Sequence, residues 1–137
     1  MNLKSYSPII TNSILFSILL IFLRIDLVFS DSLPTGGDMG AHIVPTKFFV
    51  SELISNLKIS GWSNDWFAGY PAYYFYFPLP PLVVAILSPF FSFGIAFKIM
   101  VVTSLVLLVF SIQKLISQED KISSHLGFAA GLLFLLT

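Results

Sequence analysis

The first long apolar run of the chain, residues 8–29, predicts an uncleaved membrane helix. It carries only two charges, Arg24 and Asp26, which stand near its far end, where a long side chain can reach the lipid headgroups. At about 1.5 Å per residue this run is long enough for the hydrocarbon core of a bilayer. A cleaved signal peptide is the alternative, because residues 28–30 resemble a cleavage site, but the apolar run is longer than a typical signal core.

A second apolar stretch, residues 79–116, is too long for one membrane helix. Ser88-Pro89 and Gly94 divide it, so we expect a short helix over 79–90 and a full-length helix over 94–116. A further apolar helix is expected over 122–137, where the sequence provides too few residues to cross a bilayer comfortably. We therefore expect this chain to be the N-terminal part of a longer protein whose remaining helices cover the last one.

These run lengths together predict an all-α, polytopic membrane protein with three or four membrane helices, located in the cell membrane as a multi-pass protein. The predicted organisation is a first membrane helix (1–30), an extracytoplasmic loop (31–78) and two to three membrane helices (79–137), the last of them truncated. Lys4 favours a cytoplasmic N-terminus, but the remaining basic residues do not follow the positive-inside rule, so charge alone leaves the topology open.

Composition supports a membrane protein and excludes several other classes. Apolar residues make up 56% of the 137 residues and charged residues 10%, whereas soluble domains carry about 25% charged residues. The formal net charge is zero, which gives no basic footprint for nucleic acid. The absence of Cys removes disulfides, thiolate metal sites and Cys nucleophiles. Membrane lipids are therefore the expected surroundings, and nucleic acid is not an expected partner.

Within the loop, an amphipathic helix is expected from Asp38 to about Lys58. Apolar residues recur there at helical spacing, and polar residues fall opposite: the apolar positions are Phe49, Val50, Leu53, Ile54 and Leu57. This helix is too polar to span a bilayer, so it should lie at the interface or pack on other helices. Pro45 removes one backbone hydrogen bond and should kink its first turns.

Asp38 and His42 are the first candidate functional pair. They are four residues apart, so on a helix their side chains share one face, where they could transfer a proton or bind a metal ion. Alternatively, Asp38 only caps the helix and His42 is an interfacial polar residue. Two ligands are also too few for a closed metal site.

An aromatic run is the second candidate feature, because residues 62–77 contain nine aromatic side chains. A belt at the membrane interface needs only a few such residues, so a platform for a sugar or a polyprenyl chain is an equal alternative. Asp65 within this run is a candidate second carboxylate, although an Asx turn is the simpler interpretation. The candidate substrate-binding residues are Trp62, Asp65, Trp66, Tyr70, Tyr74 and Tyr76.

Three blocks of sequence resemble bacterial multi-pass membrane proteins labelled as having a 6-pyruvoyl-tetrahydropterin synthase-related domain. The blocks are Gly36-Gly37-Asp38-Met39-Gly40-Ala41-His42, residues 61–72 (GWSNDWFAGYPA) and residues 75–80 (FYFPLP). That family in turn is similar to the C-type (GT-C) membrane glycosyltransferases, which use sugars linked to polyprenyl phosphate. The resemblance covers residues 31–95, about half of the chain.

The resemblance implies a glycosyltransferase that moves a sugar from a polyprenyl-phosphate donor to a cell-envelope glycan or protein. It places Asp38 at the position of the first-loop acid, which acts as catalytic base or helps to hold a divalent metal ion, the one cofactor implied. His42 could orient Asp38 or share its proton. We expect the 137 residues alone to be inactive. A non-catalytic membrane scaffold and a lipid carrier are the alternative functions.

Overall fold

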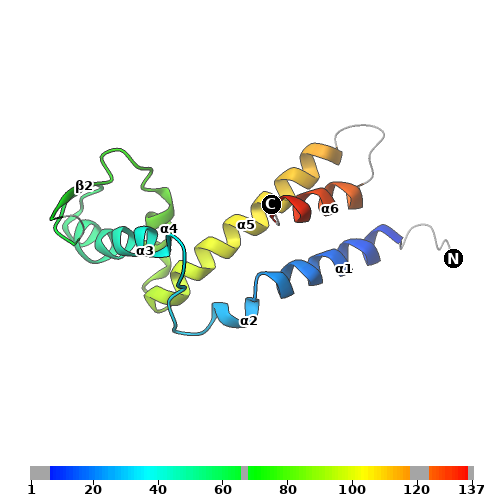
Figure 1. Cartoon of the computed structure of the whole chain (residues 1–137), viewed down its shortest axis with the longest axis horizontal. Helices are drawn as coiled ribbons and strands as arrows, with labels where there is room; N and C mark the ends of the chain where they lie inside the picture. Colours follow the sequence, from blue (N-terminus) through cyan, green and yellow to red (C-terminus); the bar gives the residue numbers. More distant parts are fainter. Residues whose placement is uncertain (1–6, 66–67, 118–123, 136–137) are drawn as a thin grey trace. The chain divides into compact units, whose positions relative to one another are not determined.

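The computed structural model describes residues 7–65, 68–117 and 124–135. Its elements are α1 (Ser7–Phe22), α2 (Ile25–Val28), α3 (Met39–Phe48), η2 (Phe49–Leu53), η3 (Ile54–Asn56), β1 (Gly61–Ser63), β2 (Tyr70–Ala72), α4 (Leu79–Leu87), α5 (Phe93–Ser117) and α6 (Ser124–Leu135) (Figure 1). The chain divides into two compact units. One contains residues 1–28 and 101–137, and the other contains residues 29–100.

The expected polytopic arrangement of three or four membrane helices is wrong. In the described ranges, one helix is long and apolar enough to cross a membrane, namely residues Phe93–Ile116 within α5. It matches the helix expected over 94–116. At about 1.5 Å per residue these 24 residues extend roughly 36 Å, which exceeds the hydrocarbon thickness. One such helix is weak evidence of membrane association, and a multi-pass protein is not supported.

The other apolar runs fail to give membrane-spanning helices because each helix is short. The run over 8–29 breaks after Phe22, where Arg24 adopts a left-handed backbone with φ of 48°, so α1 has 16 residues. Arg24 then forms an exposed ion pair of 2.9 Å with Asp26, beside the break. α4 has nine residues and the described part of α6 has 12, well below the roughly 20 that a spanning helix requires.

A small antiparallel sheet also corrects the all-α expectation. β1 pairs with β2 in the register Gly61↔Ala72, Trp62↔Pro71 and Ser63↔Tyr70, and we call residues 61–72 the hairpin. Ser63 and Ala72 are buried, whereas Trp62 is exposed. Strands of three residues are too short to show an alternating pattern in the sequence, which is why they were not expected.

The expected amphipathic helix forms residues 39–56, which we call the helical segment, but its winding changes along its length. α3 contains Pro45 and passes into one π turn (η2) and then one 3-10 turn (η3). Most of the expected stripe faces the interior: Phe49 and Leu53 are buried, and Val50 and Ile54 are half-buried. Ile43 and Thr46 extend this buried face toward the start of α3. Leu57, expected on the stripe, is instead 96% exposed, in a left-handed backbone at the end of the segment.

The unit of residues 29–100 packs α4 against the helical segment. α4 contacts both α3 and η2, and it buries Pro81 and Val84. The hairpin lies so close to η2 that a Cβ on Gly61 would be 2.7 Å from the Leu53 side chain. The helical segment, the hairpin and α4 therefore form one packed body, and the described candidate functional residues lie on it or directly beside it.

Residues 30–33 are fixed to the first turns of α5 by polar contacts. The Ser92 hydroxyl donates to the Asp31 carboxylate, and the Lys98 ammonium donates to the backbone carbonyl and the hydroxyl of Ser30. Gly94 allows this approach, because its Cβ would be 3.3 Å from the Asp31 carbonyl oxygen. These hydrogen bonds hold the first turns of α5 against Ser30 and Asp31, which precede α3 in the sequence.

In the other unit, the ends of the chain form a small apolar cluster. Leu19 of α1, Val109 of α5 and Phe128 of α6 are buried together. Phe128 also meets Phe110 edge on, with ring centroids 5.6 Å apart. Short apolar helices that cannot span a bilayer can thus bury apolar side chains by packing against other helices.

Candidate functional site

Asp38 stands at the start of α3 and does not cap it with its side chain. Gly36 and Gly37, both with positive φ, form the turn that leads into the helix. The backbone of Asp38 has φ of −90° and ψ of 15°, and its carboxylate makes no capping hydrogen bond. The carboxylate is exposed to solvent. The capping alternative for Asp38 therefore finds no support, and its carboxylate is open to a substrate.

His42 lies one helical turn after Asp38 and is also exposed. Asp38 precedes the first helical residue, Met39, so the two residues are at the start of α3 but not both within the helix. The backbone carbonyl of His42 accepts a hydrogen bond of 2.7 Å from the hydroxyl of Thr46. The backbone of His42 is thus part of α3, and its side chain is exposed.

Asp65 does not join this pair. It follows β1, and its backbone N–H donates to the Ser63 hydroxyl over 3.3 Å, in a local turn contact. Over the ranges described, no three His, Asp or Glu side chains lie close enough together to hold a metal ion. Asp38, His42 and Asp65 therefore do not form a metal site made of protein ligands alone.

The hairpin fixes Trp62 and Tyr70 and leaves a polar edge. The indole N–H of Trp62 donates to the Asn64 side-chain oxygen over 3.0 Å, and the indole lies over Gly69, where a Cβ would be 2.5 Å from the same nitrogen. The Tyr70 hydroxyl is buried without a hydrogen-bond partner. Burial, followed by the negative charge of Asp65, raises the pKa of Tyr70. Trp66, the remaining candidate of this group, lies outside the described residues.

Tyr73 connects the hairpin to the helical segment, and the sequence interpretation did not single it out. Its backbone is left-handed, with φ of 60°, and its ring meets Phe49 edge on. Its hydroxyl is hydrogen-bonded to Thr46, the residue that binds the His42 carbonyl. Burial raises the pKa of Tyr73 to about 12, although the hydrogen bond with Thr46 opposes the increase. In the sequence, the position of Thr46 four residues after His42 could have indicated its hydrogen bond to the His42 carbonyl.

Residues 74–77, which we call the aromatic segment, point their side chains away from this body. Tyr74, Phe75, Tyr76 and Phe77 are all exposed, directly after the fixed ring of Tyr73. Tyr74 and Tyr76, two candidate substrate-binding residues, are therefore accessible. Their neighbours Phe75 and Phe77 are still more exposed, although neither has a polar group.

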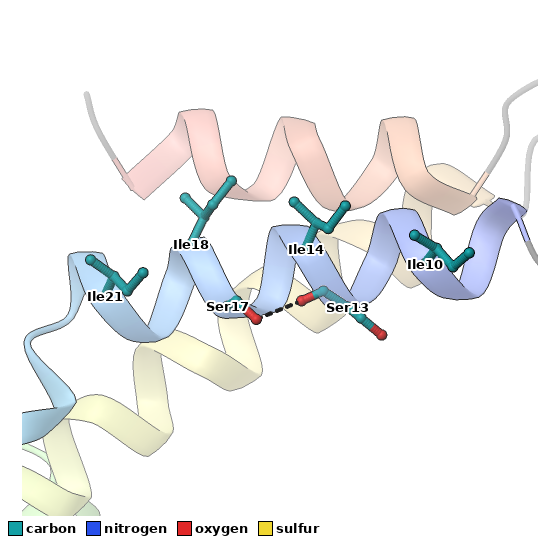
Figure 2. Close-up of a pocket in the computed structure, with 6 residues that line it drawn as sticks. All are labelled: Ile10, Ser13, Ile14, Ser17, Ile18 and Ile21. Atoms are coloured by element: carbon teal, nitrogen blue, oxygen red, sulfur yellow. Dashed lines mark hydrogen bonds between the residues drawn. The ribbon is translucent and has the colours of Figure 1, made fainter.

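A shallow hollow on α1 belongs to the other unit and contains no catalytic group. Figure 2 shows its lining, which comes from one face of the helix: Ile10, Ser13, Ile14, Ser17, Ile18 and Ile21. The Ser17 hydroxyl donates to the Ser13 carbonyl oxygen over 2.9 Å, so it serves the helix backbone. With no titratable side chain in the lining, this hollow is not a candidate active site.

Comparison of the chain with protein-family models, with curated proteins and with solved structures found no match. The glycosyltransferase interpretation therefore depends on the three sequence blocks and on the accessible residues that they contain.

Proposed function

We propose that residues 31–78 form the acid-bearing part of a membrane glycosyltransferase that resembles the GT-C enzymes. It takes a sugar from polyprenyl phosphate and transfers it to a glycan or protein of the cell envelope. α5, the one described helix that is long and apolar enough, anchors it in the membrane. The observation that carries the proposal is the exposed Asp38 carboxylate, which makes no capping hydrogen bond at the start of α3.

In this proposal Asp38 accepts the proton of the acceptor hydroxyl as that oxygen attacks the anomeric carbon of the donor. A general base must lie within hydrogen-bond reach of the proton that it removes, and an exposed carboxylate without a capping bond is available for this contact. His42, one turn along the same helix, orients the acceptor or the carboxylate by a hydrogen bond from its ring. The leaving polyprenyl phosphate keeps the electron pair of the broken bond.

The sugar and the lipid of the donor would be held by the exposed aromatic side chains. Trp62 presents its indole at the hairpin, and Tyr74 and Tyr76 are accessible in the aromatic segment. Aromatic faces suit both the apolar face of a sugar and a polyprenyl chain, and the tyrosine hydroxyls add hydrogen-bonding groups. A divalent ion would have to take most of its ligands from phosphate oxygens and water, as Mg²⁺ commonly does.

The test compares Asp38→Asn with the wild type, introduced at the gene's own locus so that the protein is made as it naturally exists. Asn can still occupy the helix start but cannot accept a proton, so folding should be retained and transfer lost. Glu52→Gln is the matched control, because Glu52 is another exposed carboxylate of the same helical segment. Isolated membranes receive radiolabelled polyprenyl-phosphate mannose or polyprenyl-phosphate glucose, and incorporation into envelope material is measured.

We expect incorporation in the wild type and in Glu52→Gln, and its loss in Asp38→Asn with unchanged protein level. Equal incorporation in both variants would contradict the role of Asp38. Movement of the labelled lipid across the membrane without cleavage would instead favour the carrier.

A further inference from the structure

A long uncharged stretch links the hairpin to the candidate membrane span. No Asp, Glu, Lys or Arg occurs from residue 66 to residue 97. Within it, Phe75 is 86% exposed and Phe77 is 87% exposed. Exposed apolar side chains are ordinary when scattered singly, but a contiguous group of them marks an interaction surface.

α4 extends this exposed apolar surface. Its sequence, LPPLVVAIL, contains no polar side chain. One face of the helix buries Pro81 and Val84, and the opposite face exposes Leu79, Leu82 and Ile86. A helix at the surface of a water-soluble body carries polar residues on its outer face, and a helix that is apolar all round is covered by protein or by lipid. The outer face of α4 therefore lacks the side chains that would suit water.

We propose that Phe75 and Phe77, together with the outer face of α4, insert into the headgroup and upper acyl region of the lipid bilayer. At nine residues α4 is too short to cross the membrane, so it lies in the interface beside the anchoring helix. Phe75 and Phe77 alternate with Tyr74 and Tyr76 of the proposed donor site, but they carry no polar group and are assigned no role in sugar transfer. Their insertion into lipid goes beyond the proposed function.

Continuity with α5 identifies lipid as the occupant. α5 starts at Phe93, shortly after α4 ends at Leu87, and residues 93–116 are long and apolar enough to cross a bilayer. The exposed Phe90 stands between the two helices. No charged residue separates α4 from the start of α5. If α5 crosses the bilayer, the exposed surface just before it therefore lies at the bilayer surface. A partner protein would have to displace lipid from the same place.

The exposed segment that contains Phe75 and Phe77 is held by a packed residue at each of its two ends. Tyr73 is fixed by its edge contact with Phe49 and its hydrogen bond with Thr46. Pro81, at the start of α4, is buried on the other side. Between these points the phenylalanine rings extend outward without having to leave a packed position, so insertion exposes no core residue.

The test places an environment-sensitive fluorophore at single cysteines, which is direct because the chain has no native Cys. Phe75→Cys, Phe77→Cys and Ile86→Cys probe the proposed surface, and Ser55→Cys is the matched control on the exposed polar side of the helical segment. All four positions are exposed, so the substitutions should leave the fold intact. The full chain is reconstituted in vesicles of phosphatidylcholine and phosphatidylglycerol, with or without lipids that carry a nitroxide quencher near the headgroup.

We expect emission at positions 75, 77 and 86 to shift to shorter wavelength and to be quenched by the nitroxide lipid, while position 55 shows neither effect. Water-like emission without quenching at the three positions would overturn the proposal. A shift to shorter wavelength without quenching would also overturn it, because protein rather than lipid would then cover the surface. None of these readouts requires sugar transfer. The test of lipid insertion therefore remains valid even if the proposed transferase activity is not found.

Discussion

The ring of Tyr73 meets the ring of Phe49 edge on, with centroids 5.0 Å apart and planes inclined by 74°. This contact joins the end of the hairpin to the one π turn of the helical segment, where Phe49 is buried. A left-handed backbone costs about 1–2 kcal/mol in a residue that carries a Cβ, so packing must compensate at Tyr73. The start of the aromatic segment is therefore set by this pair of rings.

We expect Tyr73→Phe to lower the free energy of unfolding by about 0.5–1.5 kcal/mol, because it removes one hydrogen bond and keeps the ring. Thr46→Val removes the other partner of that bond. In a double-mutant cycle, measured by denaturant unfolding in detergent, the two effects should be clearly less than additive. Simple additivity would mean that the hydroxyl groups of Tyr73 and Thr46 are not coupled.

Stability should also fall at alkaline pH because of Tyr73. Burial raises its pKa from an ordinary value of 10.0 to about 12. Between about pH 10 and pH 12 the unfolded chain loses the phenol proton while the folded chain keeps it, so raising the pH favours unfolding. Denaturant unfolding at increasing pH should show this loss in the wild type and a smaller loss in Tyr73→Phe. Tyr70, whose pKa is also raised by burial, accounts for a remaining part.

Gly69 is expected to be far less tolerant of alanine than Gly37. At Gly69, φ is 115° and a Cβ would be 2.5 Å from the Trp62 indole nitrogen, so Trp62 must move and lose its bond to Asn64. At Gly37, φ is 49° and nothing lies within 4 Å. We expect Gly69→Ala to cost about 1–3 kcal/mol more than Gly37→Ala, measured by denaturant unfolding. Equal costs would contradict the expected clash of an alanine Cβ with the Trp62 indole.

The sequence predicted elements well where one long run dominates the local pattern. α5 has an uninterrupted apolar run, and its bounds are close to those expected. The run over 8–29 looked equally suitable, but a left-handed Arg24 and its ion pair with Asp26 divide it. Such a break depends on two or three residues that an average over about 20 residues does not resolve.

The candidate site was predictable only residue by residue. Asp38 and His42 lie on the expected helix, because helical spacing is a local property. The winding change through η2 rotated the positions that follow it, which explains the exposure of Leu57. The coupling of Tyr73 to Thr46 depends on a contact between the hairpin and the helical segment, and spacing along the chain contains no information about it.

If α5 crosses the membrane, its two ends must be accessible from opposite sides. Single cysteines at Phe91 and Ser117 flank residues 93–116, and a membrane-impermeant maleimide should label one in intact cells and the other only after lysis. The 24 residues of this span extend roughly 36 Å at about 1.5 Å per residue, which exceeds the hydrocarbon core of about 30 Å. Labelling of both from the same side would contradict a span. The side on which position 91 reacts also tests the predicted extracytoplasmic location of residues 31–78.

The close approach of α6 to α5 depends on two glycines of α6. A Cβ on Gly127 would be 2.9 Å from the Gln113 carbonyl oxygen, and a Cβ on Gly131 would be 3.0 Å from the Val109 carbonyl oxygen. Their spacing, Gly127-x-x-x-Gly131, is the pattern that lets two helix backbones approach in membrane proteins. The spacing is visible in the sequence and predicts which face of α6 packs on α5.

We therefore expect Gly131→Leu to separate α6 from α5, because a leucine side chain meets backbone atoms that cannot move aside. Gly131→Ala should have a smaller effect. The higher helix propensity of alanine stabilises α6 by roughly 1 kcal/mol and partly offsets the close contact of its Cβ with Val109. Leu133→Phe, which adds bulk on the exposed side, is the control. Hydrogen exchange of the α6 amides in detergent should accelerate in Gly131→Leu and remain near wild type in Leu133→Phe. Exchange in α3 should stay unchanged in all three, because it belongs to the other compact unit. Unaltered exchange of α6 in Gly131→Leu would mean that the glycine contact does not order this helix.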